Sequence, residues 1–171
     1  NWAIINNEDF TGVTTFFIDD KIDTGDILLQ EKIKVDKKIN AGELHDKLKV
    51  IGARTVKKTI KEILSNSLIQ KKQKRDGNYR KAHKLDKENI KIDWNQNCLE
   101  IHNKVRGLSP FPGARASIIN DSGNIKRVVF YESEYFIEDH NFENGQITKE
   151  KDFIKITCNN GFILIKNLKM E

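Results

Sequence analysis

A short acidic segment is the part of this sequence whose residue types and spacing could do chemistry. Residues 19–26 read DDKIDTGD, so that four carboxylates fall within eight residues. They are Asp19, Asp20, Asp23 and Asp26. Like charges this close repel one another unless a group or a ligand uses them. The segment therefore predicts one of two things. It is either a solvated acidic turn, since Asp and Gly are ordinary turn residues, or a site that uses a carboxylate.

A calcium site is the obvious alternative for so many carboxylates, and the spacing argues against it. When the loop is read from Asp20, Gly25 takes the sixth place, as a calcium loop requires, but Ile22 and Thr24 take the third and fifth places. The two cysteines and four histidines also lack metal-type spacing. We therefore expect no metal ion, and we expect both cysteines to be packing residues in a reducing compartment.

Two predicted strands flank the acidic segment and would hold it in place. Residues 13–18 are a run of β-branched and aromatic residues, which is typical of a strand buried on both faces. Residues 27–35 alternate between apolar and polar side chains, which predicts a strand with one wetter face. Apolar residues from Leu44 to Leu64 then recur mainly every three to five positions. This pattern predicts an amphipathic helix in which Gly52 is either tolerated or marks a break.

The net charge of +5 is concentrated in one segment. Residues 1–69 carry 11 basic and 11 acidic side chains, residues 70–91 carry 9 and 3, and residues 92–171 carry 10 and 11. Residues 70–84 lack apolar periodicity and predict a linker, which is either a flexible connector or a surface for RNA phosphates. The basic side chains of the RNA-binding alternative are Lys71, Lys72, Lys74 and Arg75.

The C-terminal half predicts a short helix followed by a small β domain. Residues 98–106 are amphipathic, and residues 107–114 hold both prolines of the chain, which predicts a rigid turn. Strands are expected at residues 115–119, 127–134, 145–148, 153–157 and 161–168. Short strands after a helix favour a small open barrel of the OB type, a fold that often binds nucleic acids.

Two groups of motifs resemble one known family. Residues 1–4 (NWAI), 11–14 (TGVT) and 22–28 (IDTGDIL) resemble the second half of the catalytic domain of folate-dependent formyltransferases. Residues 84–94 (KLDKENIKIDW) and 101–114 (IHNKVRGLSPFPGA) resemble the start of the C-terminal domain of the methionyl-tRNA formyltransferases within that family. The resemblance implies an α/β fold. The C-terminal part of a Rossmann-like formyltransferase domain would occupy residues 1–69, a basic linker residues 70–85, and an OB-like tRNA-binding domain residues 86–171.

The resemblance also implies an activity and a site. The whole protein would transfer a formyl group from 10-formyltetrahydrofolate to the amino group of methionine on initiator tRNA, in translation initiation. Asp23 matches the Asp of the family's Asn–His–Asp catalytic group. The loop that holds the pterin ring of the folate in this family matches Asp20, Lys21, Ile22 and Asp23.

Further RNA contacts come from the linker and from two arginines. Lys84 and Lys87 match basic positions of the family linker that face tRNA. We add Arg106 and Arg115 from our own interpretation of the sequence, as additional cations for RNA phosphates.

The first residues predict a helix already under way, so we expect the numbering to begin at a break. In the family the catalytic Asn and His lie upstream of this point. We therefore expect this chain alone to be inactive. Residues 1–20 lack a signal peptide and no run approaches a membrane span, so we expect a cytoplasmic protein with no membrane partner. We also expect a monomer.

Three alternatives stay open at this point. Another folate-dependent formyltransferase or hydrolase, acting on a sugar nucleotide or on the folate itself, would share the two-domain plan without needing the basic linker. A non-catalytic RNA-binding module would keep the linker and lose folate binding. A plain interaction domain would require two groups of motifs to agree by accident.

Overall fold

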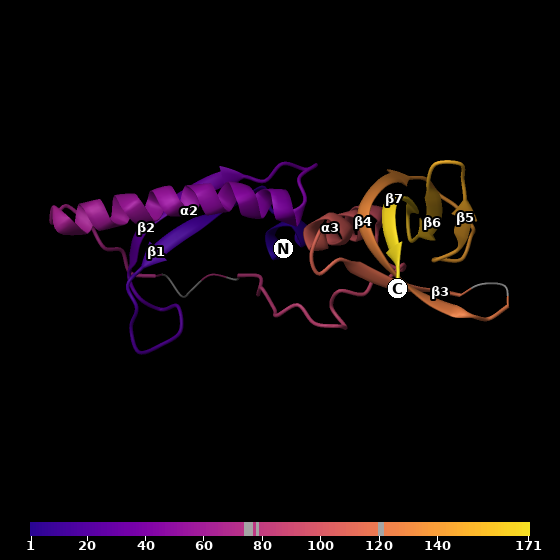
Figure 1. The fold of residues 1–171 in the computed structure, drawn as a ribbon, viewed down its shortest axis with the longest axis horizontal. Helices are drawn as coiled ribbons and strands as arrows, with labels where there is room; N and C mark the ends of the chain where they lie inside the picture. The colour runs from indigo at the N-terminus through magenta and orange to yellow at the C-terminus, as the bar shows by residue number, and fades with distance from the viewer. Residues whose placement is uncertain (74–76, 78, 120–121) are drawn as a thin grey trace. The chain divides into compact units, whose positions relative to one another are not determined.

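The computed structural model describes residues 1–73, 77, 79–119 and 122–171, which form two compact units (Figure 1). The hairpin unit comprises residues 9–36 and 43–82, and the sheet unit comprises residues 1–8, 37–42 and 83–171. Two predicted RNA contacts, Lys74 and Arg75, lie outside the described residues. Among the helices within these ranges, none combines the length and the hydropathy that crossing a membrane requires.

An antiparallel pair of strands forms the sheet of the hairpin unit. β1 (Phe10–Phe16) pairs with β2 (Ile27–Lys34). β1 begins before the predicted residue 13 and ends before Ile18, whose side chain is 93% exposed. The prediction that this strand is buried on both faces is wrong, because no residue of β1 is fully buried. In the described residues β2 is its one strand neighbour, which leaves much of β1 uncovered.

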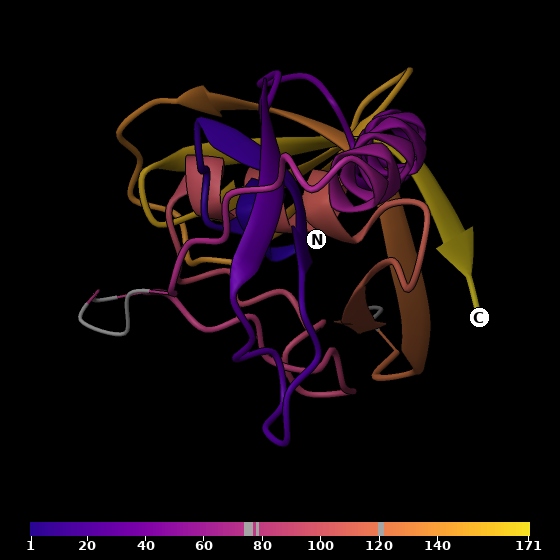
Figure 2. The ribbon, with the colours of Figure 1, turned by 90° about the vertical axis from the view of Figure 1, so that its left-hand side faces the viewer.

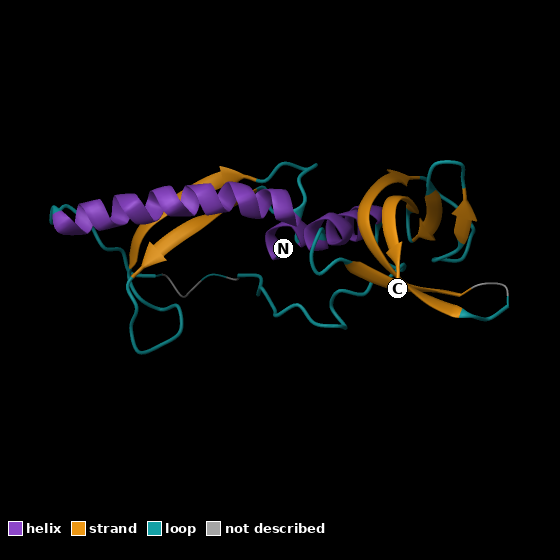
Figure 3. Cartoon of the chain, viewed as in Figure 1, coloured by secondary structure: helices purple, strands orange, loops and turns teal. Residues whose placement is uncertain are grey.

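One unbroken helix, α2 (Ala41–Leu64), lies along the β1–β2 pair (Figures 1 and 3). Gly52 is therefore tolerated in the helix interior and marks no break. The Oγ1 atoms of Thr15 on β1 and Thr59 on α2 are 2.8 Å apart. Because the Thr59 hydroxyl donates to the Thr55 carbonyl at 2.8 Å, the Thr15 hydroxyl is the donor in this pair. The contact between helix and sheet is thus partly polar.

The apolar periodicity of α2 does not match its buried face over the second half of the helix. Thr55 and Thr59 are buried, at 1% and 5% exposure, whereas Val56 and Ile60 are 49% and 52% exposed. On this face the Thr59 hydroxyl contacts Thr15 of β1, and the Thr55 hydroxyl donates to the Ile51 carbonyl at 2.9 Å. A threonine can face a sheet at little cost when its hydroxyl is hydrogen-bonded.

The sheet unit contains two helices and a strongly curled antiparallel sheet (Figure 3). Its helices are α1 (Trp2–Ile5) and α3 (Cys98–Leu108). Its strands are β3 (Ala114–Ile119), β4 (Ile125–Ile137), β5 (Ile147–Lys149), β6 (Ile154–Cys158) and β7 (Gly161–Met170). They are arranged in the order β3-β4-β7-β6-β5, and every pair is antiparallel. The predicted helix and all five predicted strands are confirmed, with boundaries shifted by a few residues.

The core of this unit lies between α3 and the curled sheet. Val105 of α3 has no exposed surface, and neither have Phe130 of β4 and Ile163 of β7. A capping box begins the helix, since the Glu100 carboxylate accepts the backbone N–H of Asn97 at 3.0 Å. Within the described residues the sheet stays open, because β3 pairs with β4 alone and β5 with β6 alone among the strands.

Candidate active site and RNA-binding residues

The loop between β1 and β2, residues 17–26, extends well beyond the ends of the two strands (Figure 2). At its base the backbone N–H of Phe17 donates to the carbonyl of Asp26 at 3.0 Å. Gly25 is essential to this closure, because a Cβ atom there would lie 1.6 Å from the Phe17 carbonyl oxygen. The glycine predicted as a turn residue is thus required for space at the base of the loop.

The four carboxylates of the loop have different surroundings. Asp19 accepts hydrogen bonds from the Thr24 hydroxyl at 2.6 and 2.8 Å and from the backbone N–H of Lys21 at 3.0 Å. It is a turn-forming residue, as the solvated-turn interpretation predicts. Asp23 is exposed and adopts a left-handed backbone conformation, with φ of +54°. No group of three or more His, Cys, Asp or Glu side chains is arranged to hold a metal ion in the described part of the chain.

The residues predicted to hold the pterin ring form one exposed turn of this loop. Ile22 is 90% exposed, and Asp20, Lys21 and Asp23 are exposed as well. Within the described residues, no intramolecular hydrogen bond occupies the backbone groups of Asp20 or Ile22. The turn therefore offers backbone donors and acceptors to an outside partner.

One residue at this loop was not predicted from the sequence. The side-chain amide of Gln73 donates to the carbonyl of Asp23 at 3.0 Å and to that of Gly25 at 2.8 Å. Two backbone hydrogen bonds hold the segment that carries Gln73 beside the loop. The N–H of Ile27 donates to the Lys71 carbonyl at 2.8 Å, and the N–H of Lys71 donates to the Ile27 carbonyl at 2.9 Å. A glutamine among lysines gives no sequence signal for such a contact.

The predicted RNA-binding lysines lie at the surface of their own units. Lys71 and Lys72 are exposed in the hairpin unit, and Lys84 and Lys87 are exposed in the sheet unit. Lys87 lines a groove of about 810 Å³ in the sheet unit, together with Lys91, Arg115 and Arg127. The same groove also holds the carboxylates of Asp86, Glu88 and Glu171, so that its charge is mixed.

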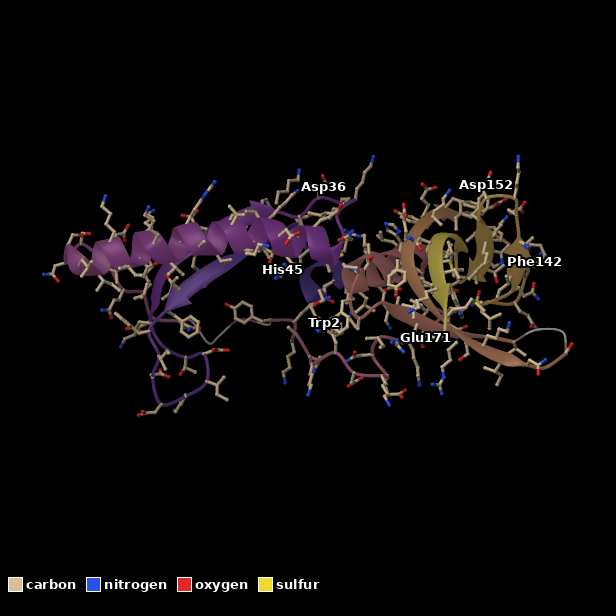
Figure 4. The ribbon with its side chains drawn as sticks, viewed as in Figure 1. Trp2, Asp36, His45, Phe142, Asp152 and Glu171 are labelled. Carbon is tan, nitrogen blue, oxygen red and sulfur yellow. The ribbon has the colours of Figure 1, made fainter. Side chains whose placement is uncertain are left out.

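The two arginines added to the RNA contacts have different environments. Arg106 is buried, at 6% exposure, and its guanidinium donates from Nη1 to the Ile39 carbonyl at 2.9 Å and from Nε to Asn103 Oδ1 at 2.8 Å. It holds the interior of the sheet unit together, and its burial argues against the predicted contact with an RNA phosphate. Arg115 keeps a side chain that is 42% exposed, and its Nη1 lies 3.0 Å from the carboxylate of Glu171, which is labelled in Figure 4.

The scattered histidines also have different surroundings, and His102 is the most perturbed. Burial, followed by the positive charge of Arg106, lowers the pKa of His102 from 6.5 to about 4. Its Nδ1 lies 3.1 Å from the Ser133 hydroxyl, and its ring lies 5.2 Å from that of Tyr135. The negative charge of Glu134 acts in the opposite direction and raises the pKa of His102, but it is outweighed by burial and by Arg106.

Both halves of the chain match known families. Residues 84–171 match the family described as "Formyl transferase, C-terminal domain", and residues 1–60 match "Formyl transferase". A methionyl-tRNA formyltransferase of Flavobacterium johnsoniae is 44% identical over 170 residues, which cover 99% of this chain and 54% of the relative. One of Clostridium beijerinckii is 39% identical over 170 residues, with 99% and 53% covered. The chain thus spans about half the length of these relatives.

Solved structures of N-formyltransferases have a similar fold. An N-formyltransferase of Helicobacter canadensis, in complex with folinic acid and dTDP-3-aminofucose, matches with a TM-score of 0.70 at 24% identity. The match covers 98% of this chain and 59% of that one. A 4-N formyltransferase of Francisella tularensis matches with a TM-score of 0.58 at 28% identity, covering 72% and 51%. The first likeness concerns the fold alone, because the identity is low.

Proposed function

Because this chain belongs to the formyl transferase family, we propose that it is the C-terminal half of an enzyme that formylates the methionyl group of initiator tRNA. The formyl donor in this proposal is 10-formyltetrahydrofolate. One observation carries the proposal: 99% of the chain aligns with a methionyl-tRNA formyltransferase at 44% identity. The enzyme would act as a cytoplasmic monomer in translation initiation.

The proposed chemistry assigns the catalytic carboxylate to Asp23. A neutral amine attacks the formyl carbon, so the site must stabilise an oxyanion and remove protons from the attacking nitrogen. By family resemblance, Asp23 works with an Asn and a His that lie outside this chain. Its exposed carboxylate would orient that pair and relay protons through water. The conformation of Asp23 supports this role, because a residue held in the left-handed region often belongs to a functional site.

The donor would bind at the turn formed by residues 20–23. A pterin ring presents both hydrogen-bond donors and acceptors along its edge, and backbone N–H and carbonyl groups can satisfy both kinds. The backbone groups of Asp20 and Ile22, which lack partners within the described residues, support this assignment. The exposed side chain of Ile22 could in addition cover an apolar ring face.

We also propose a function for each segment of the chain. Residues 1–69 would complete the catalytic domain, residues 70–85 would be a basic linker, and residues 86–171 would be an OB-like tRNA-binding domain. The family matches to residues 1–60 and 84–171 support these limits. The exposed cations Lys71, Lys72, Lys84, Lys87 and Arg115 would contact tRNA, with Lys74 and Arg75 in the same linker.

The test uses the natural polypeptide that contains this chain, assayed for formyl transfer from 10-formyltetrahydrofolate to methionyl-tRNA. Asp23→Asn should lower kcat by at least about 100-fold, because the proton-moving group is lost. Asp152→Asn, at an exposed position in the sheet unit, is the matched control (Figure 4). The 171 residues alone should show no transfer above a buffer control. Equal activity of the Asp23 and Asp152 variants would contradict the assignment.

A second candidate function is formyl transfer to an amino sugar linked to a nucleotide. The sequence leaves this acceptor open, because such an enzyme would share the two-domain plan. The cluster of basic residues at 70–91 argues for RNA instead, because a single sugar nucleotide needs no such density of charge. Competition between tRNA and a dTDP-amino sugar in the same assay decides between the two acceptors.

A further inference from the structure

We infer that Gln73 is a positioning residue for Asp23 and couples the basic linker segment to the acidic loop. This inference rests on the proposed function for its catalytic meaning, since Asp23 is the proposed proton-moving group. It goes further by identifying what holds Asp23 in place and by predicting that RNA bound at the linker orders the loop.

The contact itself is chemically well defined. The Gln73 side chain donates from one nitrogen to two carbonyls, those of Asp23 at 3.0 Å and of Gly25 at 2.8 Å. Carbonyl oxygens only accept hydrogen bonds, so the amide must present its NH₂ group to them. Each of the two hydrogens on that nitrogen is donated to one of the two carbonyls. Gln73 is also partly buried, whereas Gln70 in the same segment is exposed.

Both carbonyls follow the left-handed conformation of Asp23 in the chain, one in Asp23 itself and one two residues later. Asp23 has φ of +54°, which residues other than glycine rarely adopt and which persists when the surrounding structure holds it. The hydrogen bond to the Asp23 carbonyl fixes the peptide plane that follows Asp23, and the bond to the Gly25 carbonyl fixes the base of the loop. Together they set the direction in which the Asp23 carboxylate leaves the backbone.

The segment that carries Gln73 also carries two exposed cations. Lys71 is held to Ile27 by a two-way backbone bridge, and the side chains of Lys71 and Lys72 are exposed. A phosphate bound by these lysines would restrict the segment that presents Gln73. By linkage, any ordering of the loop by RNA must be matched by tighter RNA binding when the loop is ordered.

The first test needs neither activity nor RNA. Backbone ¹⁵N order parameters of residues 23–25 are measured in the natural polypeptide that contains this chain. They should fall from about 0.7 to about 0.5 in Gln73→Ala. Gln73→Glu, which keeps the length but loses the donors, should show the same loss. Gln70→Ala and Gln70→Glu should match the unmodified protein, as should β4 and β7 in every variant. Unchanged order parameters in the two Gln73 variants would overturn the inference.

The second test examines the coupling. Adding initiator tRNA should raise the order parameters of residues 23–25 in the unmodified protein and in Gln70→Ala, but not in Gln73→Ala. In the enzymatic assay, Gln73→Ala should lower kcat by about 100-fold, as expected for a misplaced catalytic group, with KM for tRNA changed less than about threefold. A change in KM alone would overturn the positioning role.

The outcomes also separate this inference from the proposed function. If tRNA does not bind at all, the RNA-binding part of the proposed function fails. The comparison of Gln73 and Gln70 variants without RNA still decides whether Gln73 holds the loop. If tRNA binds and is formylated normally by Gln73→Ala, the proposed function stands and the positioning role is wrong.

Discussion

The Sγ atoms of Cys98 and Cys158 lie 3.0 Å apart in the core of the sheet unit, where neither side chain has any exposed surface. Cys98 is the first residue of α3, and Cys158 is the last residue of β6. Cys98 Sγ lies 3.5 Å from the Phe136 carbonyl and donates to it, so the Cys158 thiol is the donor between the two sulfurs. The pair connects the start of the helix to the sheet.

The first prediction concerns the reactivity of this pair. Burial, followed by the hydrogen bond with Cys98, raises the pKa of Cys158 from 9.0 to about 12. Because both side chains are buried, and because the thiolate is the reactive form, iodoacetamide at pH 8 should label neither cysteine in the folded protein and both in urea. The raised pKa also predicts that the free energy of unfolding falls as pH rises from about 9 to about 12, since only the unfolded chain loses the proton there. In Cys158→Ala this fall should be smaller. Rapid native labelling would contradict the prediction.

The second prediction concerns acid stability. The pKa of His102 is lowered to about 4 in the folded protein, mainly by burial and then by Arg106. Below pH 6.5 the unfolded chain binds a proton that the folded protein does not, so stability present above pH 6.5 should be lost as pH falls toward 4. The loss should be on the order of 2 kcal/mol, allowing for partial exposure of the ring. His102→Gln should flatten this dependence in urea titrations. His45→Gln, at an exposed position on α2, should leave it unchanged.

Much of the fold could be predicted from local pattern. The helix at residues 98–106 and the five strands after it follow from periodicity and turn residues, because their burial is supplied by neighbours within the same unit. The buried face of α2 could not be predicted in this way. Thr55 and Thr59 can be buried because their hydroxyls donate to the carbonyls of Ile51 and Thr55, and Thr59 also contacts Thr15. Apolar periodicity carries no information about such hydrogen bonds.

The candidate site was also predictable only in part, because local sequence patterns do not show contacts between distant segments. Asp23 could be singled out because its motif and the surrounding carboxylates lie in one short segment. Gln73 could not, because its contact with Asp23 crosses 50 positions of sequence. Arg106 and Arg115 could not be told apart by charge alone. Only the fold shows that the first donates to the Ile39 carbonyl in the interior while the second remains at the surface.

The third prediction contrasts two glycines of the hairpin unit. Gly25→Ala should lower the free energy of unfolding by about 2 kcal/mol or more, because its Cβ would meet the Phe17 carbonyl oxygen and open the base of the loop. Gly52→Ala should raise it by about 0.5–1 kcal/mol, since Ala is the better helix former and the nearest atom, on Val13, is 3.9 Å away. Urea unfolding of the two variants provides the comparison. A stabilising effect of Gly25→Ala would contradict the described loop closure.

The fourth prediction separates structural from RNA-binding arginines. Arg106→Met should lower the free energy of unfolding by about 2–4 kcal/mol, because the Ile39 carbonyl and the Asn103 side chain lose a charged donor in the interior. Arg115→Ala should cost less than about 1 kcal/mol, because its ion pair with Glu171 is partly exposed. For tRNA binding the order should reverse. Arg115→Ala should reduce the slope of log K against log salt by about 1, and Arg106→Met, measured where it is fully folded, should leave that slope unchanged. If both variants changed the slope equally, the claim that Arg106 stabilises the fold without contacting tRNA would be wrong.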